Sequence, residues 1–159
     1  MRILLLVSGL CLIVACNTHS VGGDPFPSFD ILLVDSSMRL NTTTIKEGVP
    51  IALLYFSPDC EHCQKETEVI LHHMNSFKEV QFYFITNDPL DRLRAFNGHY
   101  QLAKYPNIIL GRDEQFFLLR HFKGAYPPYL VIYDRHKKQR VAFQGDVTVD
   151  TIISSINNL

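Results

Sequence analysis

The sequence has little charge, no excess of either sign and no apolar run of the length that spans a membrane. Its 159 residues carry a formal net charge of −1, and only 19% of them are charged. The near-neutral balance gives no support for nucleic-acid binding, because no basic stripe stands out along the chain. The low charge, together with 47% hydrophobic residues, argues against disorder and predicts one domain with its own core.

Cysteine is also scarce, and its four positions fall into two groups. Cys11 and Cys16 belong to an N-terminal segment in which one arginine precedes the mostly apolar run Ile3–Ala15. This pattern is typical of a signal-peptide core. The run ends in Ile-Val-Ala-Cys, which resembles the bacterial lipobox. The resemblance implies that residues 1–15 are removed and that acyl chains on Cys16 tether the protein to a membrane. An ordinary cleaved signal with an incidental cysteine is the alternative.

The second group, Cys60 and Cys63, forms the one Cys-x-x-Cys pair of the mature chain. A single pair excludes a small domain scaffolded by disulfides. Structural zinc usually needs four ligands, and the sequence has neither a second cysteine pair nor histidines at the usual spacing. We therefore predict no metal site and interpret the pair as redox-active, with a copper-carrying thiol pair as the alternative.

Apolar runs and turn residues predict an α/β fold. Residues 16–28 are polar, with glycine and proline, and indicate a flexible tether. The order of the later runs predicts a mixed β-sheet flanked by helices on both faces. The cysteines follow the most apolar strand, at the carboxyl end where sites form in such sheets. The predicted strands are 29–34, 50–56, 80–86, 107–110, 129–133 and 140–144, and the predicted helices are 60–77, 89–100, 113–122 and 149–157.

The position of the pair at the start of a helix predicts different roles for the two thiols. Backbone N–H groups and the helix dipole at the first turn favour the thiolate of Cys60 over its thiol. Cys63 lies almost one turn later on the same face, so we expect it to be the more buried resolving thiol. A protonated His62 would add to the stabilisation, whereas Asp59 would oppose it unless it caps the helix.

Three segments together resemble one known family. They are "FPSF" before the first strand, "IALLYFSPDCEHCQKE" at the cysteines and "YPPYLVIYD" later in the chain. They are similar to the TlpA-like branch of membrane-tethered bacterial thiol–disulfide oxidoreductases. The resemblance implies a thioredoxin-like domain over residues 29–159, located in the cell envelope and facing the periplasm. It also implies protein thiol or disulfide substrates and a redox partner, without a cofactor.

The same resemblance implies roles for residues outside the pair. In that family an X-Pro bond like the one at Pro128 is cis and lies against the disulfide, so Tyr126 and Pro127 would border the substrate groove. In cytochrome c maturation members, a glutamate at the place of Glu66 is thought to assist proton transfer at the buried cysteine. The alternative for Glu66 is a solvated helix residue. The Cys-x-His-Cys order also resembles strongly oxidising periplasmic disulfide donors.

The sequence departs from this family at three places. Asp59 stands where tryptophan usually precedes the first cysteine, and the chain has no tryptophan. Leu54 replaces the buried acid of cytosolic thioredoxins. Pro127 has no N–H to pair with an extended substrate. The first and third departures favour a rival interpretation, in which the protein is a tethered adaptor without enzymatic activity.

Overall fold

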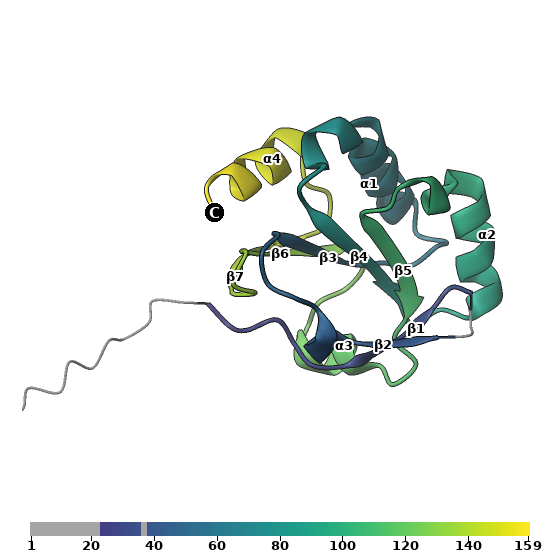
Figure 1. Cartoon of the computed structure of the whole chain (residues 1–159). Helices are drawn as coiled ribbons and strands as arrows, with labels where there is room; N and C mark the ends of the chain where they lie inside the picture. The colour runs from purple at the N-terminus through teal and green to yellow at the C-terminus, as the bar shows by residue number, and fades with distance from the viewer. Residues whose placement is uncertain (1–22, 36–37) are drawn as a thin grey trace, which may run out of the picture.

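The computed structural model describes residues 23–35 and 38–159, which form one seven-stranded sheet with helices packed on it (Figure 1). The strand order is β2-β1-β5-β4-β3-β6-β7. The strands are β1 (Asp30–Leu33), β2 (Arg39–Asn41), β3 (Ile51–Tyr55), β4 (Gln81–Thr86), β5 (Ile108–Arg112), β6 (Tyr129–Tyr133) and β7 (Gln139–Gln144). The helices are α1 (Glu61–His72), α2 (Leu90–Tyr100), α3 (Phe117–His121) and α4 (Val149–Asn157), with short 3-10 helices at Thr42–Thr44, Met74–Phe77 and Leu102–Lys104.

Strand β3 leads directly into the segment with the cysteines, and its two neighbouring strands run in opposite directions. It runs parallel to β4 and antiparallel to β6, and Leu54 pairs with Phe84 on one side and Leu130 on the other. All five residues of β3 are buried. A strand buried on both faces needs an uninterrupted apolar sequence, which is what the predicted strand 50–56 showed. The mixed sheet of the prediction is confirmed.

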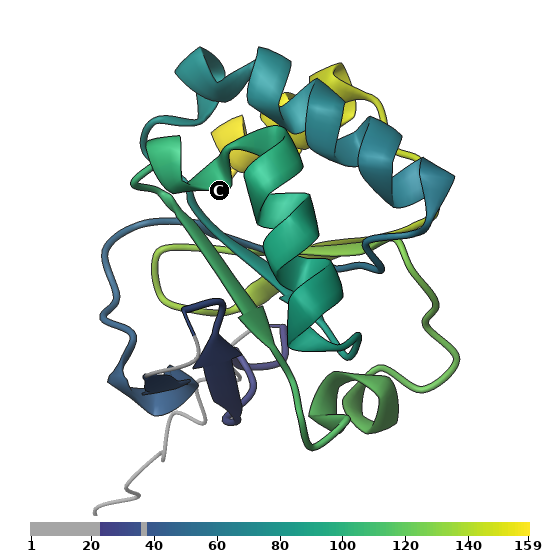
Figure 2. The same ribbon diagram turned by 90° about the vertical axis from the view of Figure 1, so that its right-hand side faces the viewer.

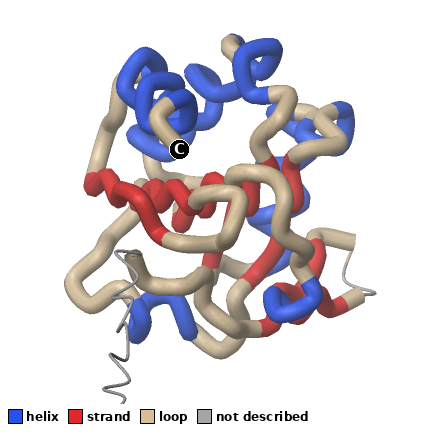
Figure 3. Tube along the Cα trace, turned by 60° about the vertical axis from the view of Figure 1, so that its left-hand side comes forward, coloured by secondary structure: helices blue, strands red, loops and turns tan. Residues whose placement is uncertain are grey.

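Helices cover both faces of the sheet, as predicted, but unequally (Figures 1 and 2). Successive residues of a strand point to opposite faces. Leu54 therefore packs in the core under α1, α2 and α4, whereas Leu53 packs with Leu118 of α3 on the other face. Figure 3 shows the same arrangement, with most of the helices gathered on one side of the red strands. The cysteines belong to the face with three helices.

The residues just before β1 are docked on the domain. Pro25 forms a β-bridge with Lys138, and the ring of Phe26 packs edge-on against Tyr133 with 4.9 Å between ring centroids. Ordered contacts thus begin before Phe29. Because β3 and β6 are antiparallel, Tyr133 lies beside the start of β3, at the end of the sheet opposite to the cysteines.

Two predicted helices have different limits in the structure. The prediction of one helix over 60–77 is wrong in its length, because α1 ends at His72 and a separate 3-10 turn follows. The prediction of a helix over 113–122 is also wrong, because α3 covers only five residues. Phe116 has a left-handed backbone (φ 54°), and the buried carboxylate of Asp113 accepts a hydrogen bond from the Leu118 N–H at 2.8 Å. Residues 113–116 thus form a loop that caps the helix.

The predicted signal peptide, with Cys11 and Cys16, lies outside the described residues. Within the ranges that the structure describes, no helix has both the length and the apolar character needed to cross a membrane. The tether predicted for 16–28 is described only from Gly23 onward, where it forms the docked segment above.

Candidate active site

Cys60 is the residue from which α1 begins. Its backbone is extended (φ −85°, ψ 117°), and its carbonyl accepts a hydrogen bond from the Gln64 N–H at 3.0 Å. It is therefore the N-cap rather than a first-turn residue, and the suggestion that Asp59 caps the helix is wrong. The Cys60 side chain makes no capping hydrogen bond and is half-buried. Its sulfur is thus a partly accessible thiol beside the free N–H groups of the first turn.

Cys63 lies next to Cys60 but is fully buried. Both are free thiols, and the Cys60 sulfur is close enough to influence the pKa of Cys63. Burial raises the pKa of Cys63 well above its ordinary value, and the Cys60 sulfur and the charge of Glu66 raise it further. The Ser57 N–H, 3.5 Å from the Cys63 sulfur, acts in the opposite direction. Cys63 accordingly needs a base before it can act as a nucleophile.

Glu66 lies one turn after Cys63 on the same helix face and is only 3% exposed. One carboxyl oxygen, Oε2, accepts a hydrogen bond from the Val147 N–H at 3.3 Å, and Oε1 is buried with no hydrogen-bond partner among the described residues. Burial raises the pKa of Glu66 to about 7, with a further increase from the charge of Asp146 and a decrease from the Val147 N–H. A solvated helix glutamate is therefore not what the structure contains.

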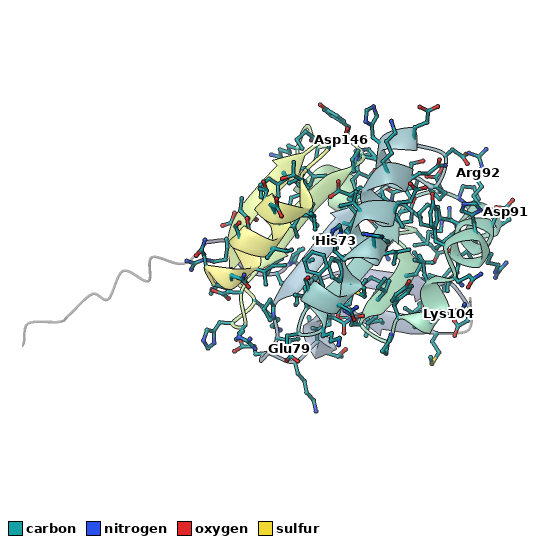
Figure 4. The ribbon with its side chains drawn as sticks, turned by 90° about the horizontal axis from the view of Figure 1, so that it is seen from above. His73, Glu79, Asp91, Arg92, Lys104 and Asp146 are labelled. Atoms are coloured by element: carbon teal, nitrogen blue, oxygen red, sulfur yellow. The ribbon has the colours of Figure 1, made fainter. Side chains whose placement is uncertain are left out.

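His62, between the two cysteines, is held by an acidic residue from another element. Its Nδ1 lies 2.9 Å from both carboxylate oxygens of Asp146, which follows β7. Both side chains are more than half exposed. Figure 4 shows Asp146 and Arg92 at one end of the helical layer, with Glu79 at the other. The sequence predicts that a protonated His62 stabilises the Cys60 thiolate, and the structure shows in addition that a carboxylate is paired with this ring.

Asp59 is paired in a similar way on the other side of the pair. Its carboxylate forms a salt bridge with Arg92 of α2, which also lies 3.9 Å from Asp88. This ion pair forms part of the wall of a groove of about 460 Å³ that lies between the start of α1 and the length of α2. The groove is lined by Pro58, Asp59, Gln64, Arg92, Ala95, Phe96, His99 and Tyr100.

The loop before β6 contains a cis peptide bond between Pro127 and Pro128, as the family resemblance implied. The Gln144 side chain holds this loop: its Nε2 donates to the carbonyl oxygens of Tyr126 and Pro128, and its Oε1 accepts from the Tyr126 N–H. The Gly145 N–H also donates to the Pro128 carbonyl at 3.0 Å. Tyr126 itself is 61% exposed. The loop is fixed from the β7 side and open to solvent on its other side.

Sequence reasoning missed Ser57, Gln144 and Asp146. Asp146 lies 84 residues from His62 in the chain, and no motif around it indicates the contact. Among residues 23–35 and 38–159, no group of three or more histidine, cysteine, aspartate or glutamate side chains is arranged to hold a metal ion. The titratable groups near the cysteines are instead arranged as one ion pair on each side and one buried carboxyl.

Neither a protein-family model nor a curated protein matches this sequence. Solved structures do match. A secreted Mycobacterium tuberculosis disulfide oxidoreductase, homologous to DsbE of E. coli, has a TM-score of 0.68 at 16% identity, over 82% of this chain and 96% of that one. DsbF of the same organism, in mixed oxidized and reduced forms, has a TM-score of 0.69 at 19% identity, over 82% of this chain and 93% of that one. The peroxidoxin BcpB, also from that organism, has a TM-score of 0.71 at 14% identity, over 87% of this chain and 97% of that one.

These similarities establish a thioredoxin fold for the chain, and the fold prediction is confirmed. The chain is thus a thioredoxin-fold protein with a free Cys-x-x-Cys pair at the start of α1.

Proposed function

We propose that this protein is a thiol–disulfide oxidoreductase that acts on protein substrates through Cys60 and Cys63. One observation carries the proposal. A partly accessible thiol and a buried free thiol lie together at the start of α1, and a buried carboxyl with a pKa of about 7 follows one turn later on the same helix face. A general base works best when its pKa is near the working pH.

The first step uses the accessible thiol. The Cys60 thiolate attacks one sulfur of a substrate disulfide, so the substrate S–S bond breaks and a Cys60–substrate mixed disulfide forms. The other substrate sulfur leaves as a thiolate and takes a proton from solvent. The first-turn N–H groups next to Cys60 stabilise its negative charge before the attack.

The second step uses the buried thiol. Cys63 gives its proton to the ionised Glu66 and attacks the Cys60 sulfur. The Cys60–Cys63 disulfide forms, and the second substrate sulfur leaves as a thiolate and is protonated. The protein loses two electrons and two protons, and the substrate gains both. The reverse sequence oxidises a substrate dithiol, and a redox partner restores the starting state in either direction.

Substrate would bind across the loop that precedes β6. An extended chain can pair with a free backbone edge by adding a strand. Tyr126, exposed beside Pro127, would contact the substrate, and Pro128 would lie at the base of the groove. Cytochrome c maturation-type reduction and general disulfide exchange are the two activities that this arrangement suits, because both present a protein thiol or disulfide in an extended segment.

We further propose that the protein acts in the bacterial cell envelope, on the periplasmic side, held by lipid on Cys16. The support is the signal-peptide pattern of residues 1–15 and the Ile-Val-Ala-Cys sequence that closes it. Intact mass spectrometry of protein extracted from membranes should show loss of residues 1–15 and added acyl mass on Cys16. An unmodified soluble form would contradict the anchor.

A glutathione redox titration of the full-length protein in detergent tests the central proposal. We expect one reversible two-electron transition, monitored by alkylation of Cys60 and Cys63, that disappears when either cysteine is changed to serine. Absence of the transition would support the adaptor instead. Stoichiometric copper(I) binding without disulfide exchange would support the metal carrier.

A further inference from the structure

Four consecutive residues, starting with the last residue of β7, contact the substrate loop, His62 and Glu66. Gln144 and Gly145 hold the substrate loop, Asp146 binds His62, and the Val147 N–H holds Glu66. Asp146 is the charged member of this segment, and it lies between the exposed side and the buried side of the cysteine pair. Nothing in the sequence links it to the cysteines.

We propose that Asp146 is a positioning residue that tunes the Cys60–Cys63 pair through His62, which it holds, and through Glu66, which the N–H of the next residue holds. The inference rests on the proposed exchange reaction and names the residue that tunes it. Asp146 acts through the His62 ring, which it contacts, and through the electrostatic effect of its charge on Glu66.

The first effect is charge compensation at His62. A protonated His62 between the cysteines would stabilise the Cys60 thiolate, and a pair whose reduced form is stabilised is a stronger oxidant. Two carboxylate oxygens at 2.9 Å neutralise this cation and also hold the ring in one orientation. Asp146 therefore makes the pair less oxidising than the Cys-x-His-Cys order by itself suggests. The exposure of both side chains keeps the effect modest.

The second effect reaches Glu66. Two titratable groups interact electrostatically with Glu66. They are Cys63, on the same helix, and Asp146, on the segment packed against that helix. The negative charge of Asp146 raises the pKa of Glu66, after the larger effect of burial. The neighbouring Val147 N–H acts in the opposite direction. Asp146 thus favours the protonated form of Glu66 electrostatically, while the next residue holds the carboxyl in place.

The test uses four full-length variants, each with both cysteines intact. They are Asp146→Asn, His62→Gln, the double variant Asp146→Asn/His62→Gln, and Asp150→Asn as a control. Asp150 is an exposed acid in the first turn of α4, so its replacement removes the same charge nearby without touching His62. Two quantities are measured: the equilibrium constant with glutathione, and the pH midpoint of the Glu66 carboxyl followed by NMR.

For the equilibrium, we expect Asp146→Asn to shift the constant roughly two- to fivefold toward the dithiol form of the protein, the range of an exposed ion pair. The same change in the His62→Gln background should have no effect, because no cation remains to be compensated. Asp150→Asn should match the parent. An Asp146→Asn constant equal to that of Asp150→Asn would overturn this half of the proposal.

For the carboxyl, we expect Asp146→Asn to lower the Glu66 midpoint by about half a pH unit, as loss of one partly screened charge would. The change should be the same with or without His62, whereas Asp150→Asn should leave the midpoint unchanged. An unchanged or raised midpoint in Asp146→Asn would overturn the second half. A parent protein that shows no glutathione transition defeats the proposed function instead, and the NMR titration still decides on Asp146.

Discussion

The two cysteines lie one helical turn apart, yet their surroundings differ in almost every physical respect. Around Cys60, the side chains of His62 and Asp59 are exposed, and each has a partner from another element: Asp146 for His62, and Arg92 for Asp59. Around Cys63 there is no such ion pair within the described part of the chain. The carboxyl group there, Glu66, is buried, and one of its oxygens has no hydrogen-bond partner among the residues that the structure describes.

The difference shows two ways in which a protein accommodates charge near a reactive thiol. In water an ion pair forms easily and contributes about 0.2–1 kcal/mol. In the interior the same charge is expensive, so Glu66 changes its proton affinity instead, from 4.5 to about 7. Because one pKa unit corresponds to about 1.4 kcal/mol, the free energy needed to ionise the buried Glu66 is several times the free energy contributed by an exposed ion pair. Changes on the buried side should therefore have the larger effects.

The largest effect is expected from the thiols themselves. Cys60→Ser should abolish formation of a mixed disulfide, because Cys63 is buried and poorly ionised. Cys63→Ser should instead trap the mixed disulfide, because the resolving thiol is missing. Mass spectrometry of each variant after reaction with a disulfide-containing peptide measures both. Trapping by Cys60→Ser would reverse the assigned roles.

The next largest effect is expected at the buried base. Glu66→Gln should slow resolution by Cys63 roughly 10- to 100-fold at pH 8, at or below the lower end of general-base contributions. The parent rate should rise with pH through about 7, where Glu66 ionises, and the variant rate should lack this rise. Stopped-flow kinetics measures it, with exposed Glu68→Gln as the matched control. Equal profiles would return Glu66 to a structural role.

The same substitution should raise stability. The folded pKa of Glu66, about 7, lies above its ordinary value of 4.5, so ionisation favours the unfolded chain. Parent stability should fall as pH rises from about 4.5 to about 7 and then level off. Glu66→Gln removes this loss and should be more stable at pH 8 by on the order of 2–3 kcal/mol. Denaturant unfolding with a reductant tests this, and parallel curves for parent and variant would contradict it.

A smaller effect is expected in the substrate loop. Pro127→Thr supplies the N–H that proline lacks, and one main-chain hydrogen bond contributes about 0.5–1.5 kcal/mol. Capture of an extended peptide should therefore improve up to roughly tenfold. Peptide trapping in the Cys63→Ser background measures the change, with the exposed neighbour varied as Tyr126→Phe for comparison. No gain would mean that substrate does not pair with this backbone.

The smallest effect is expected on the exposed side. Arg92→Gln breaks the ion pair with Asp59 and should change stability by less than about 1 kcal/mol, because both side chains are more than half exposed. Raising the salt concentration should reduce even this difference. Thermal unfolding at low and high salt measures it. A loss of several kcal/mol would show that the two sides of the site do not differ as described.

Local patterns in the sequence predict the main elements because each has a continuous apolar signal. α4 begins and ends at the predicted residues, Val149 and Asn157, and β3 lies within the predicted strand 50–56. The strand missed, β2, has three residues, none fully buried, so burial leaves no pattern there. The short α3 depends on a left-handed backbone at Phe116, which no apolar period predicts.

The candidate site divides in the same way. Cys60, Cys63 and Glu66 share one helix, so their spacing alone predicts a common face. Asp146 reaches His62 only through the packing of β7 and α4 beside α1, and its position results from folding of the whole chain. Asp59 does not cap its own helix, because Cys60 is the N-cap, and tertiary structure supplies Arg92 as its partner.

The docked segment before β1 has a geometric consequence for a lipid-anchored enzyme. The Asp24 carbonyl accepts a hydrogen bond from the Gln139 N–H, so the contacts with the domain begin there and not at Phe29. From the proposed anchor at Cys16, the chain could extend at most about 30 Å to reach Asp24, instead of about 45 Å to reach Phe29. It also attaches at the end of the sheet opposite to the cysteines. With the proposed anchor at Cys16, a short connection to this end of the sheet would orient the reactive thiols away from the bilayer and toward proteins in the aqueous phase.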